Sequence, residues 1–254
     1  MSSKVRFQVF AQAFMVALGV MAAAGAGAEE SSPAVSVDAA VFSSYLWRGQ
    51  VLNDEAALQP ALTVSKSGLS INLWHSMDLT SRADAKGDFS EMDLTLAYGR
   101  SFDAVGINGG LAYYTFPGPG KGAQGIEAFL SLSAAVPASP AVAVYYGFNG
   151  LQGVYASLSL GHSFSFSEKY GLALGVTAGY GTDKYNKLYF GVDENRMNDV
   201  TASATFSAGV TDALTVKPIL QYTVLVDDKI ADGGTAIYGD DSKFAGGIAL
   251  SYSL

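Results

Sequence analysis

Apolar and polar residues alternate along most of the chain once its apolar N-terminal stretch has ended. In one segment Leu69, Ile71 and Leu73 share one parity, whereas Ser70 and Asn72 share the other. Alternation with a period of two places apolar side chains on one face of a β-strand and polar side chains on the other. The alternating segments predict twelve strands, at 35–47, 57–66, 69–79, 90–100, 106–116, 125–136, 141–149, 152–162, 171–181, 198–210, 214–227 and 242–254.

The connections between these predicted strands alternate in length. The short ones lie at 66–68, 100–105, 137–140, 163–170 and 211–213. The longer or more polar ones lie at 48–56, 80–89, 117–124, 182–196 and 228–241. The brief 149–151 link departs from this rule. Tight turns at one end and long loops at the other predict an all-β fold, a transmembrane up-and-down antiparallel β-barrel of about 12 strands.

Two other architectures fit the pattern less well. A soluble β-sandwich has strands of about 5–6 residues and hides its apolar faces in a shared core. Twelve longer strands would offer more apolar face than two packed sheets can cover. A bundle of membrane helices needs about 18–20 consecutive apolar residues per helix. After the N-terminal stretch, polar residues or glycine interrupt the apolar runs every few positions, which excludes a polytopic helical membrane protein.

The N-terminus has the three parts of a secretory signal peptide. Lys4 and Arg6 supply the positive end, an apolar stretch covers 9–24, and Ala26-Gly27-Ala28 fits the small-residue cleavage rule. We expect export to the cell outer membrane, with 1–28 as the signal peptide and 29–254 as the barrel. A single transmembrane anchor is the alternative. Loss of Lys4 and Arg6 changes the formal charge from −8 to −10.

Composition restricts the chemistry that this chain can perform. It has no Cys and only two His, which leaves no thiolate metal site and little basis for a zinc centre. Its negative charge argues against nucleic acid as a partner, since nucleic-acid sites are basic. We expect no cofactor and no metal, and we expect outer-membrane lipid, lipopolysaccharide and small solutes as partners. The oligomeric state is left open.

Aromatic residues gather near the loop-side ends of several predicted strands. In outer-membrane barrels such residues form a girdle at the level of the lipid headgroups. Aromatic residues also favour strands in general, which is the alternative explanation. The predicted girdle residues are Tyr45, Trp47, Tyr113, Tyr114, Phe116, Tyr145, Tyr146, Phe148, Tyr180 and Tyr222.

An enzymatic barrel would need a histidine with a serine or an acid on the same strand face. His75 and His162 are each followed by serine, but neighbours on a strand point to opposite faces. Neither histidine has a local partner, so we predict no catalytic residue. A triad built across strands leaves a membrane-embedded hydrolase as a minor alternative.

Charged residues on the polar face are better candidates for function. They form either a selectivity lining or an internal salt-bridge network, and the sequence leaves both open. The lumen and selectivity candidates are Asp38, Arg48, Asp78, Asp93, Glu127 and Lys217. The bulky inward residues expected to form a constriction are Phe42, Trp74 and Phe129. Small inward residues dominate the later strands, which predicts a narrow, off-centre passage.

The first strand carries a run, 43–49, that reads Ser-Ser-Tyr-Leu-Trp-Arg-Gly. A second-strand segment, 58–62, follows with Gln59-Pro60, and Asn72-Leu73-Trp74 comes after it. Together these three segments resemble the opening of the TorF-type porins. The resemblance covers roughly 37–80 and implies an outer-membrane channel. We therefore expect a porin-like channel for passive diffusion of small cationic or neutral solutes. A non-conducting structural or partner-docking barrel is the alternative.

Overall fold

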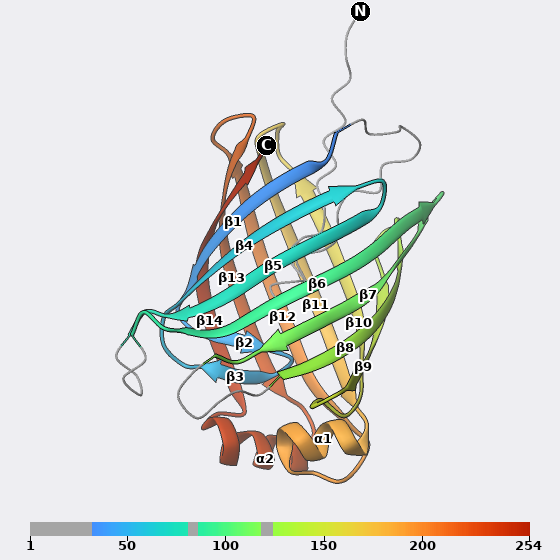
Figure 1. Ribbon diagram of the computed structural model, residues 1–254, viewed down its shortest axis with the longest axis vertical. Coiled ribbons are helices and arrows are strands. Elements are labelled where there is room, and N and C mark those ends of the chain that lie inside the picture. Colours follow the sequence, from blue (N-terminus) through green and yellow to red (C-terminus); the bar gives the residue numbers. More distant parts are fainter. Residues whose placement is uncertain (1–31, 81–85, 118–123) are drawn as a thin grey trace, which may run out of the picture.

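The computed structural model describes residues 32–80, 86–117 and 124–254, so the predicted signal peptide lies outside the described residues. Twelve strands close into one antiparallel barrel in the order β1-β14-β13-β12-β11-β10-β9-β8-β7-β6-β5-β4 (Figure 1). The wall strands are β1 (Ala34–Phe42), β4 (Ala57–Lys66), β5 (Leu69–Asp78), β6 (Phe89–Phe102), β7 (Val105–Thr115), β8 (Gln124–Ala134), β9 (Ala141–Phe148), β10 (Gly153–Ser165), β11 (Tyr170–Gly181), β12 (Arg196–Gly209), β13 (Leu214–Leu225) and β14 (Ser242–Ser253).

The alternation of the sequence becomes the two faces of the barrel wall. On β6, Leu94 and Leu96 are exposed on the outside, whereas Asp93 and Thr95 are buried on the inside. The same division runs around the wall and leaves a continuous set of apolar side chains exposed on its outer surface. The predicted all-β barrel of about 12 strands is confirmed.

The predicted first strand, 35–47, is wrong beyond Phe42. The Ser43 backbone N–H still bonds the Gly246 carbonyl oxygen at 2.8 Å, but the Ser44 hydroxyl donates to the Asp54 carbonyl oxygen at 3.2 Å. The chain therefore leaves the wall after Ser43, because the Ser44 side chain pairs with a residue of its own loop and not with a neighbouring wall strand. The following residues form a separate hairpin, β2 (Tyr45–Trp47) with β3 (Gln50–Asn53).

Two of the predicted long loops contain helices, α1 (Asp183–Phe190) and α2 (Asp228–Tyr238). Asp227 caps α2 by accepting bonds from the backbone N–H groups of Lys229 and Ile230, and Gly239 ends it in the left-handed conformation. Both helices lie at the end of the barrel opposite to the start of β1 and the end of β14 (Figure 1). Among the described residues, no helix is long and apolar enough to cross a membrane.

The predicted aromatic girdle divides between the two faces of the wall. Tyr113 and Tyr146 are exposed on the outer face, but their neighbours Tyr114 and Tyr145 point inward. The prediction is wrong for the inward pair because adjacent residues on a strand face opposite ways. It is also wrong for the two aromatic residues of β2, since that strand lies inside the barrel. Phe116 borders an interior cavity, whereas the remaining predicted members are exposed: Phe148, Tyr180 and Tyr222.

Candidate functional site

The β2–β3 hairpin turns at Arg48 and Gly49, between the paired residues Trp47 and Gln50. Arg48 has φ 49° and Gly49 has φ 79°, as a two-residue type I′ turn requires. A Cβ atom at Gly49 would lie 2.6 Å from side-chain atoms of both Asp199 and Leu225. Glycine therefore lets the tip of the hairpin approach β12 and β13 closely.

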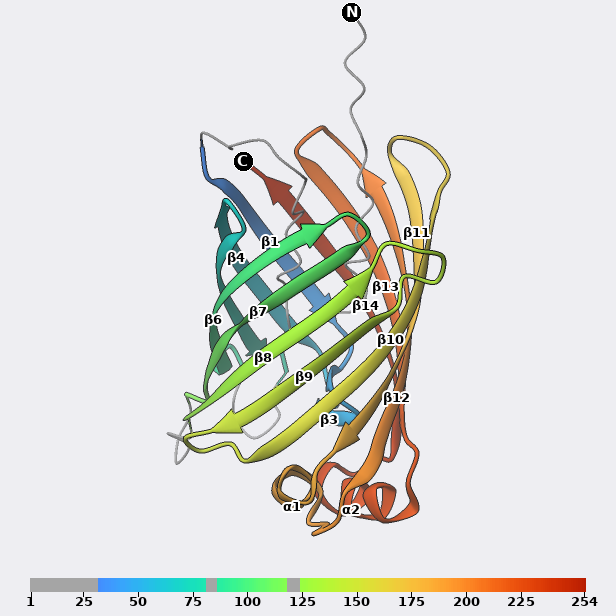
Figure 2. The same ribbon diagram turned by 90° about the vertical axis from the view of Figure 1, so that its right-hand side faces the viewer.

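The hairpin crosses the whole interior of the barrel. It starts from the wall between β1 and β4, and β9 and β10 lie opposite these strands in the closed order. The Arg48 guanidinium at its tip lies 4.1 Å from the ring centroid of Tyr145 on β9 and 4.6 Å from that of Tyr155 on β10. Figure 2 shows β3 inside the loop end of the barrel. The lumen is therefore bridged from wall to wall.

Arg48 forms a buried, bidentate ion pair with Glu127. Its Nη1 and Nη2 atoms donate to Oε1 and Oε2 of Glu127 at 2.9 and 2.8 Å. The Tyr114 hydroxyl donates to Glu127 Oε2 at 3.0 Å, and the guanidinium lies 4.4 Å from the Trp47 ring centroid. Burial alone would lower the pKa of Arg48, but the Glu127 carboxylate raises it above its ordinary value. The guanidinium therefore stays charged although aromatic rings surround it. Both its ion pair with Glu127 and its contacts with the rings are strengthened by the exclusion of water.

Contacts on both flanks hold the hairpin in place. Near its root, the Tyr45 ring lies 5.5 Å from the Trp74 ring of β5, measured between centroids. The Asn53 side chain donates to Asp78 Oδ1 at 2.8 Å. Gln50 meets both helices, because its Oε1 accepts from the Tyr238 hydroxyl at 2.7 Å and its Nε2 donates to the Tyr185 hydroxyl at 3.4 Å.

The two helices cover the loop end over an apolar cluster. Its buried members are Tyr155, Tyr185, Phe190, Leu225 and Ile230. Ion pairs surround the cluster: Glu194 binds both Lys229 and Arg196, and Arg196 Nη1 lies 3.1 Å from Asp227 Oδ2. The hydrogen bonds from Lys229 and Arg196 lower the pKa of Glu194. The lid formed by α1 and α2 thus combines an apolar centre with charged residues at its edge.

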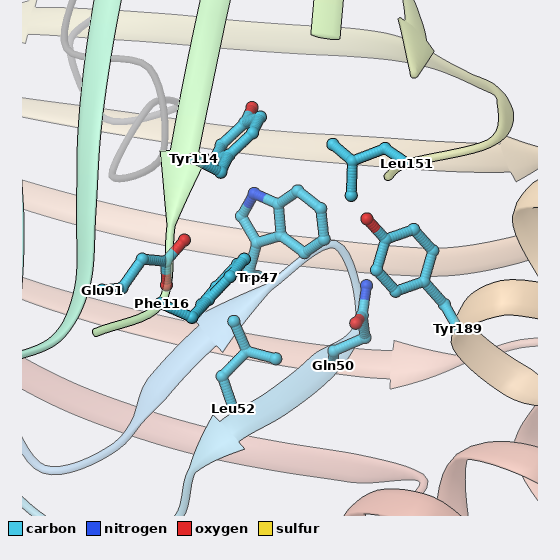
Figure 3. A pocket seen from close by; sticks show the side chains of 8 residues that line it. All are labelled: Trp47, Gln50, Leu52, Glu91, Tyr114, Phe116, Leu151 and Tyr189. Atoms are coloured by element: carbon cyan, nitrogen blue, oxygen red, sulfur yellow. The ribbon is translucent and has the colours of Figure 1, made fainter. Parts of the chain in front are cut away.

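A small cavity remains beside the hairpin (Figure 3). Its volume is about 60 Å³, far below the roughly 300–1,000 Å³ typical of ligand pockets. The Glu91 carboxylate points toward it from β6, next to Trp47 and Phe116 (Figure 3). The lining residues are Trp47, Gln50, Leu52, Glu91, Tyr114, Phe116, Leu151 and Tyr189. Beside the hairpin, the described residues thus enclose a cavity that has room for water-sized molecules and not for a typical ligand.

The predicted charged residues fall into separate groups. Arg48 and Glu127 meet directly, whereas Asp78 binds Asn53 of the hairpin. Asp38 and Lys217 are joined through the Ser251 hydroxyl, which accepts from Lys217 Nζ at 2.9 Å and donates to Asp38.

Asp93 faces the interior from β6, opposite Trp74 of β5. The three bulky residues predicted to form a constriction lie against the wall or the hairpin root. Phe42 packs on Ile219 and Ala249, Phe129 packs on Ala97 and Tyr145, and Trp74 packs on Tyr45.

Several interior residues of the site were not among the predicted candidates. Glu91 shares the inner face with Asp93, a position that the period of two already indicated. Asp199 accepts a hydrogen bond from the Tyr155 hydroxyl at 2.9 Å beneath the hairpin tip. The sequence carries no local signal for this contact, because the two residues lie 44 positions apart.

Both histidines point away from the interior. His75 lies on β5 between inward Trp74 and Ser76, and its ring is 5.1 Å from that of Phe89. His162 is exposed on the outer face of β10, with its ring 4.6 Å from that of Phe164. The described residues contain no group of three or more His, Asp or Glu side chains arranged to hold a metal.

A closed barrel with an apolar outer surface and a polar interior defines the class of porin-like β-barrels. The chain belongs to the Gcw_chp family, described as bacterial protein of unknown function, whose model matches residues 26–212. No match was found among curated proteins.

Solved outer-membrane barrels have the same fold. The KdgM porin, in a complex with disordered oligogalacturonate, matches with a TM-score of 0.53 at 11% identity, over 87% of this chain and 99% of that chain. The NanC porin matches with a TM-score of 0.53 at 12% identity, over 87% of this chain and 100% of that chain. An outer membrane channel from Pseudomonas putida F1 matches with a TM-score of 0.50 at 8% identity, over 87% and 94%.

Proposed function

We propose that this protein is a narrow outer-membrane channel for passive diffusion of small solutes, closed at its loop end by the β2–β3 hairpin and the two helices. The observation that carries the proposal is the closed wall of twelve strands, apolar outside and polar inside. The fold shared with porins and the TorF-type run at 43–49 support it. Because the strand register pairs His75 with Met92 and His162 with Leu174, so that among the described residues neither has a serine or an acid beside it on its own face, we infer a channel without enzymatic activity.

The charges of the interior favour cations or neutral molecules as solutes. Glu91, Asp93 and Asp199 are buried inside the barrel, and Arg48 is already paired with Glu127. Carboxylates that line a low-dielectric passage attract cations and repel anions. Among the predicted selectivity residues, Asp93 is the best one to test, because replacing Glu127 would also release Arg48.

Single-channel recording of the refolded protein in a planar bilayer tests the proposal. In a KCl gradient we expect discrete openings and a reversal potential on the cation-selective side. Asp93→Asn should move that potential toward zero, whereas Asp212→Asn, in an exposed turn at the opposite end, should leave it unchanged. Selectivity should weaken at 1 M salt, where the Debye length is about 3 Å. An anion-selective wild type would contradict the assignment of the solutes.

The outer membrane and the orientation in it can be tested by labelling intact cells. The sequence has no Cys, so single cysteines can be placed at exposed Asp193, beside α1, and at exposed Asp212, in a short turn. An impermeant maleimide should label Asp193→Cys on intact cells and label Asp212→Cys only after the outer membrane is opened. The reverse pattern would invert the proposed topology.

A non-conducting barrel that docks a partner is the second candidate. The hairpin that spans the interior and the helices that cover it favour this function, because they fill the route that a solute would take. The two candidates differ in one recording. If neither the wild type nor a variant without the hairpin conducts, the docking role replaces the channel.

A further inference from the structure

Four polar side chains lie next to one another on the inner face of β4, β5 and β6. The strand register pairs Ser76 with Glu91, and Asp93 follows on the same face of β6. Since Leu58 pairs with Met77, the register also places Gln59 opposite Ser76. Neighbours across a ladder have Cβ atoms about 4.5–5.5 Å apart, so the four side chains share one patch of the wall.

This patch, Gln59, Ser76, Glu91 and Asp93, is buried but incompletely hydrogen-bonded. The exposed fractions of the four residues are 3%, 0%, 6% and 8%. Both amide atoms of Gln59, the Ser76 hydroxyl and Oδ1 of Asp93 have no hydrogen-bond partner among the described residues. Buried polar groups are almost always paired, because each unpaired one costs free energy. Several unpaired oxygens together indicate a ligand that supplies what the chain does not.

The surroundings of the patch leave its negative charge uncompensated. Tyr45 of the hairpin shares a side-chain hydrogen bond with Glu91, and its ring lies 5.5 Å from that of Trp74, which pairs with Asp93 across the β5–β6 ladder. In the described part of the chain, no ion pair joins Glu91 or Asp93 to a basic residue, and the nearby guanidinium of Arg48 is bound by Glu127. Two buried carboxylates without a counter-charge are strongly unfavourable unless protons or a bound cation neutralise them.

We propose that this patch binds a hard cation of the Ca²⁺ class. Glu91 and Asp93 supply two negative charges that balance a divalent ion, and the Gln59 and Ser76 oxygens with water complete a set of oxygen ligands. Because the site has two carboxylates and no third acidic or histidine ligand among the described residues, its affinity falls in the weak, exchangeable range of about 10⁻⁴–10⁻³ M. The proposal does not depend on conduction.

The experiment uses the refolded mature protein in detergent, titrated with CaCl₂ and with TbCl₃. Tb³⁺ takes oxygen ligands and emits when energy is transferred from a nearby indole, so Trp74 should sensitise it under excitation at a tryptophan wavelength. We expect Tb³⁺ emission that Ca²⁺ displaces, and a melting temperature that rises with Ca²⁺. Trp74→Phe should reduce the Tb³⁺ emission and leave the Ca²⁺-dependent rise in melting temperature in place.

Matched variants locate the ion. Asp93→Asn and Glu91→Gln should each weaken Ca²⁺ binding by at least about 10-fold, since each removes one charged ligand. Asp199→Asn is the control, because it is equally buried in the opposite wall and its amide oxygen still accepts the bond from Tyr155.

A wild type that binds no Ca²⁺ at millimolar concentration would overturn the proposal. That result would indicate that protons, and not a bound cation, neutralise the two carboxylates. Binding that survives both Asp93→Asn and Glu91→Gln would overturn it as well, since the ion would then occupy exposed loop acids. Binding that is lost in these variants of a protein that does not conduct would support the site and reject the channel.

Discussion

The two ends of the barrel interior are built from different kinds of side chain. At the loop end, Arg48, Trp47, Tyr145 and Tyr155 form a packed layer of aromatic rings around one charge. At the turn end, the inward residues are small, and Lys217 reaches Asp38 through one hydroxyl group. The small inward residues of this end include Ser159, Ser163, Ala173, Thr205, Ser207 and Ser251.

The features that form the wall are different from those that fill it. Both ends obey the same alternation, so strand pattern alone does not decide whether the interior is open. The loop end is filled because a connection from one side of the barrel reaches the opposite side. We therefore expect the main resistance to ion flow to lie at the hairpin and not at the turn end.

Removing the hairpin should have the largest effect. Replacing 44–54 with a short glycine–serine linker removes the only described segment that bridges β1 and β4 to β9 and β10. We expect a conductance several-fold above that of the wild type, with the barrel still resistant to denaturation by detergent at room temperature. An unchanged conductance in a folded variant would place the main resistance at the turn end.

Breaking the ion pair should release the hairpin tip without removing it. Arg48→Ala leaves the buried Glu127 without its counter-charge, and breaking a desolvated ion pair in this way costs about 3–5 kcal/mol. We expect more frequent and longer openings in single-channel recordings. The double variant Arg48→Met with Glu127→Leu is the control, because replacing both partners with apolar groups removes the unpaired charge. If the single and double variants open with the same frequency and duration, the unpaired charge of Glu127 is not what releases the hairpin tip.

Glycine at the turn should matter through packing as well as through backbone conformation. Gly49→Ala brings a Cβ within 2.6 Å of Asp199 and Leu225, whereas Gly191→Ala meets nothing within 4 Å. Both positions have positive φ, so both variants carry a backbone cost of about 1–2 kcal/mol. Only Gly49→Ala should also displace the tip and raise the open probability. If both variants behave alike, the tip is not tightly seated.

Lowering the pH should produce the smallest effect, at the ion pairs of Glu194 beside α1 and α2. The pKa of Glu194 is lowered by Lys229 and Arg196, so its stabilising contribution is present above its ordinary pKa. That contribution is lost as the pH falls through the lowered pKa, below the ordinary range of a glutamate. In a Trp74→Phe background, Trp47 emission should shift on acidification, because its ring lies 5.6 Å from that of Tyr189 on α1. Glu194→Gln should flatten this shift.

The wall was largely predictable from the sequence, and the hairpin was not. Local alternation determines which strand face meets lipid, and most strand limits follow from it. The segment 45–47 continues the alternation, so the pattern predicts it as part of the first strand, although it forms β2 in the interior. The signal that could have separated it is Gly49, because glycine readily adopts the positive φ that a tight turn between short strands requires. Its partner Glu127 lies 79 positions away, beyond the reach of any local pattern.

The sequence carries clear signals for the ends of both helices. Asp227 before α2 and Gly239 after it are a typical N-cap and C-terminal stop. Gly191 ends α1 in the same way. Long connections were expected to be loops, and short helices with clear caps show that length alone does not define their structure. The candidate charges were found by parity, but which of them pair depends on contacts across the lumen.

The distant partners of the hairpin impose an order on biogenesis. Arg48 needs Glu127, and Gln50 needs Tyr238, which is 188 positions later in the chain. Contacts between segments so far apart form late, because the intervening chain must first be ordered. The hairpin is synthesised early yet has no complete binding surface until β8 to β13 and α2 are in place. A barrel that stalls before its last strands would thus keep an unseated hairpin, which a protease could recognise as the mark of an unfinished molecule.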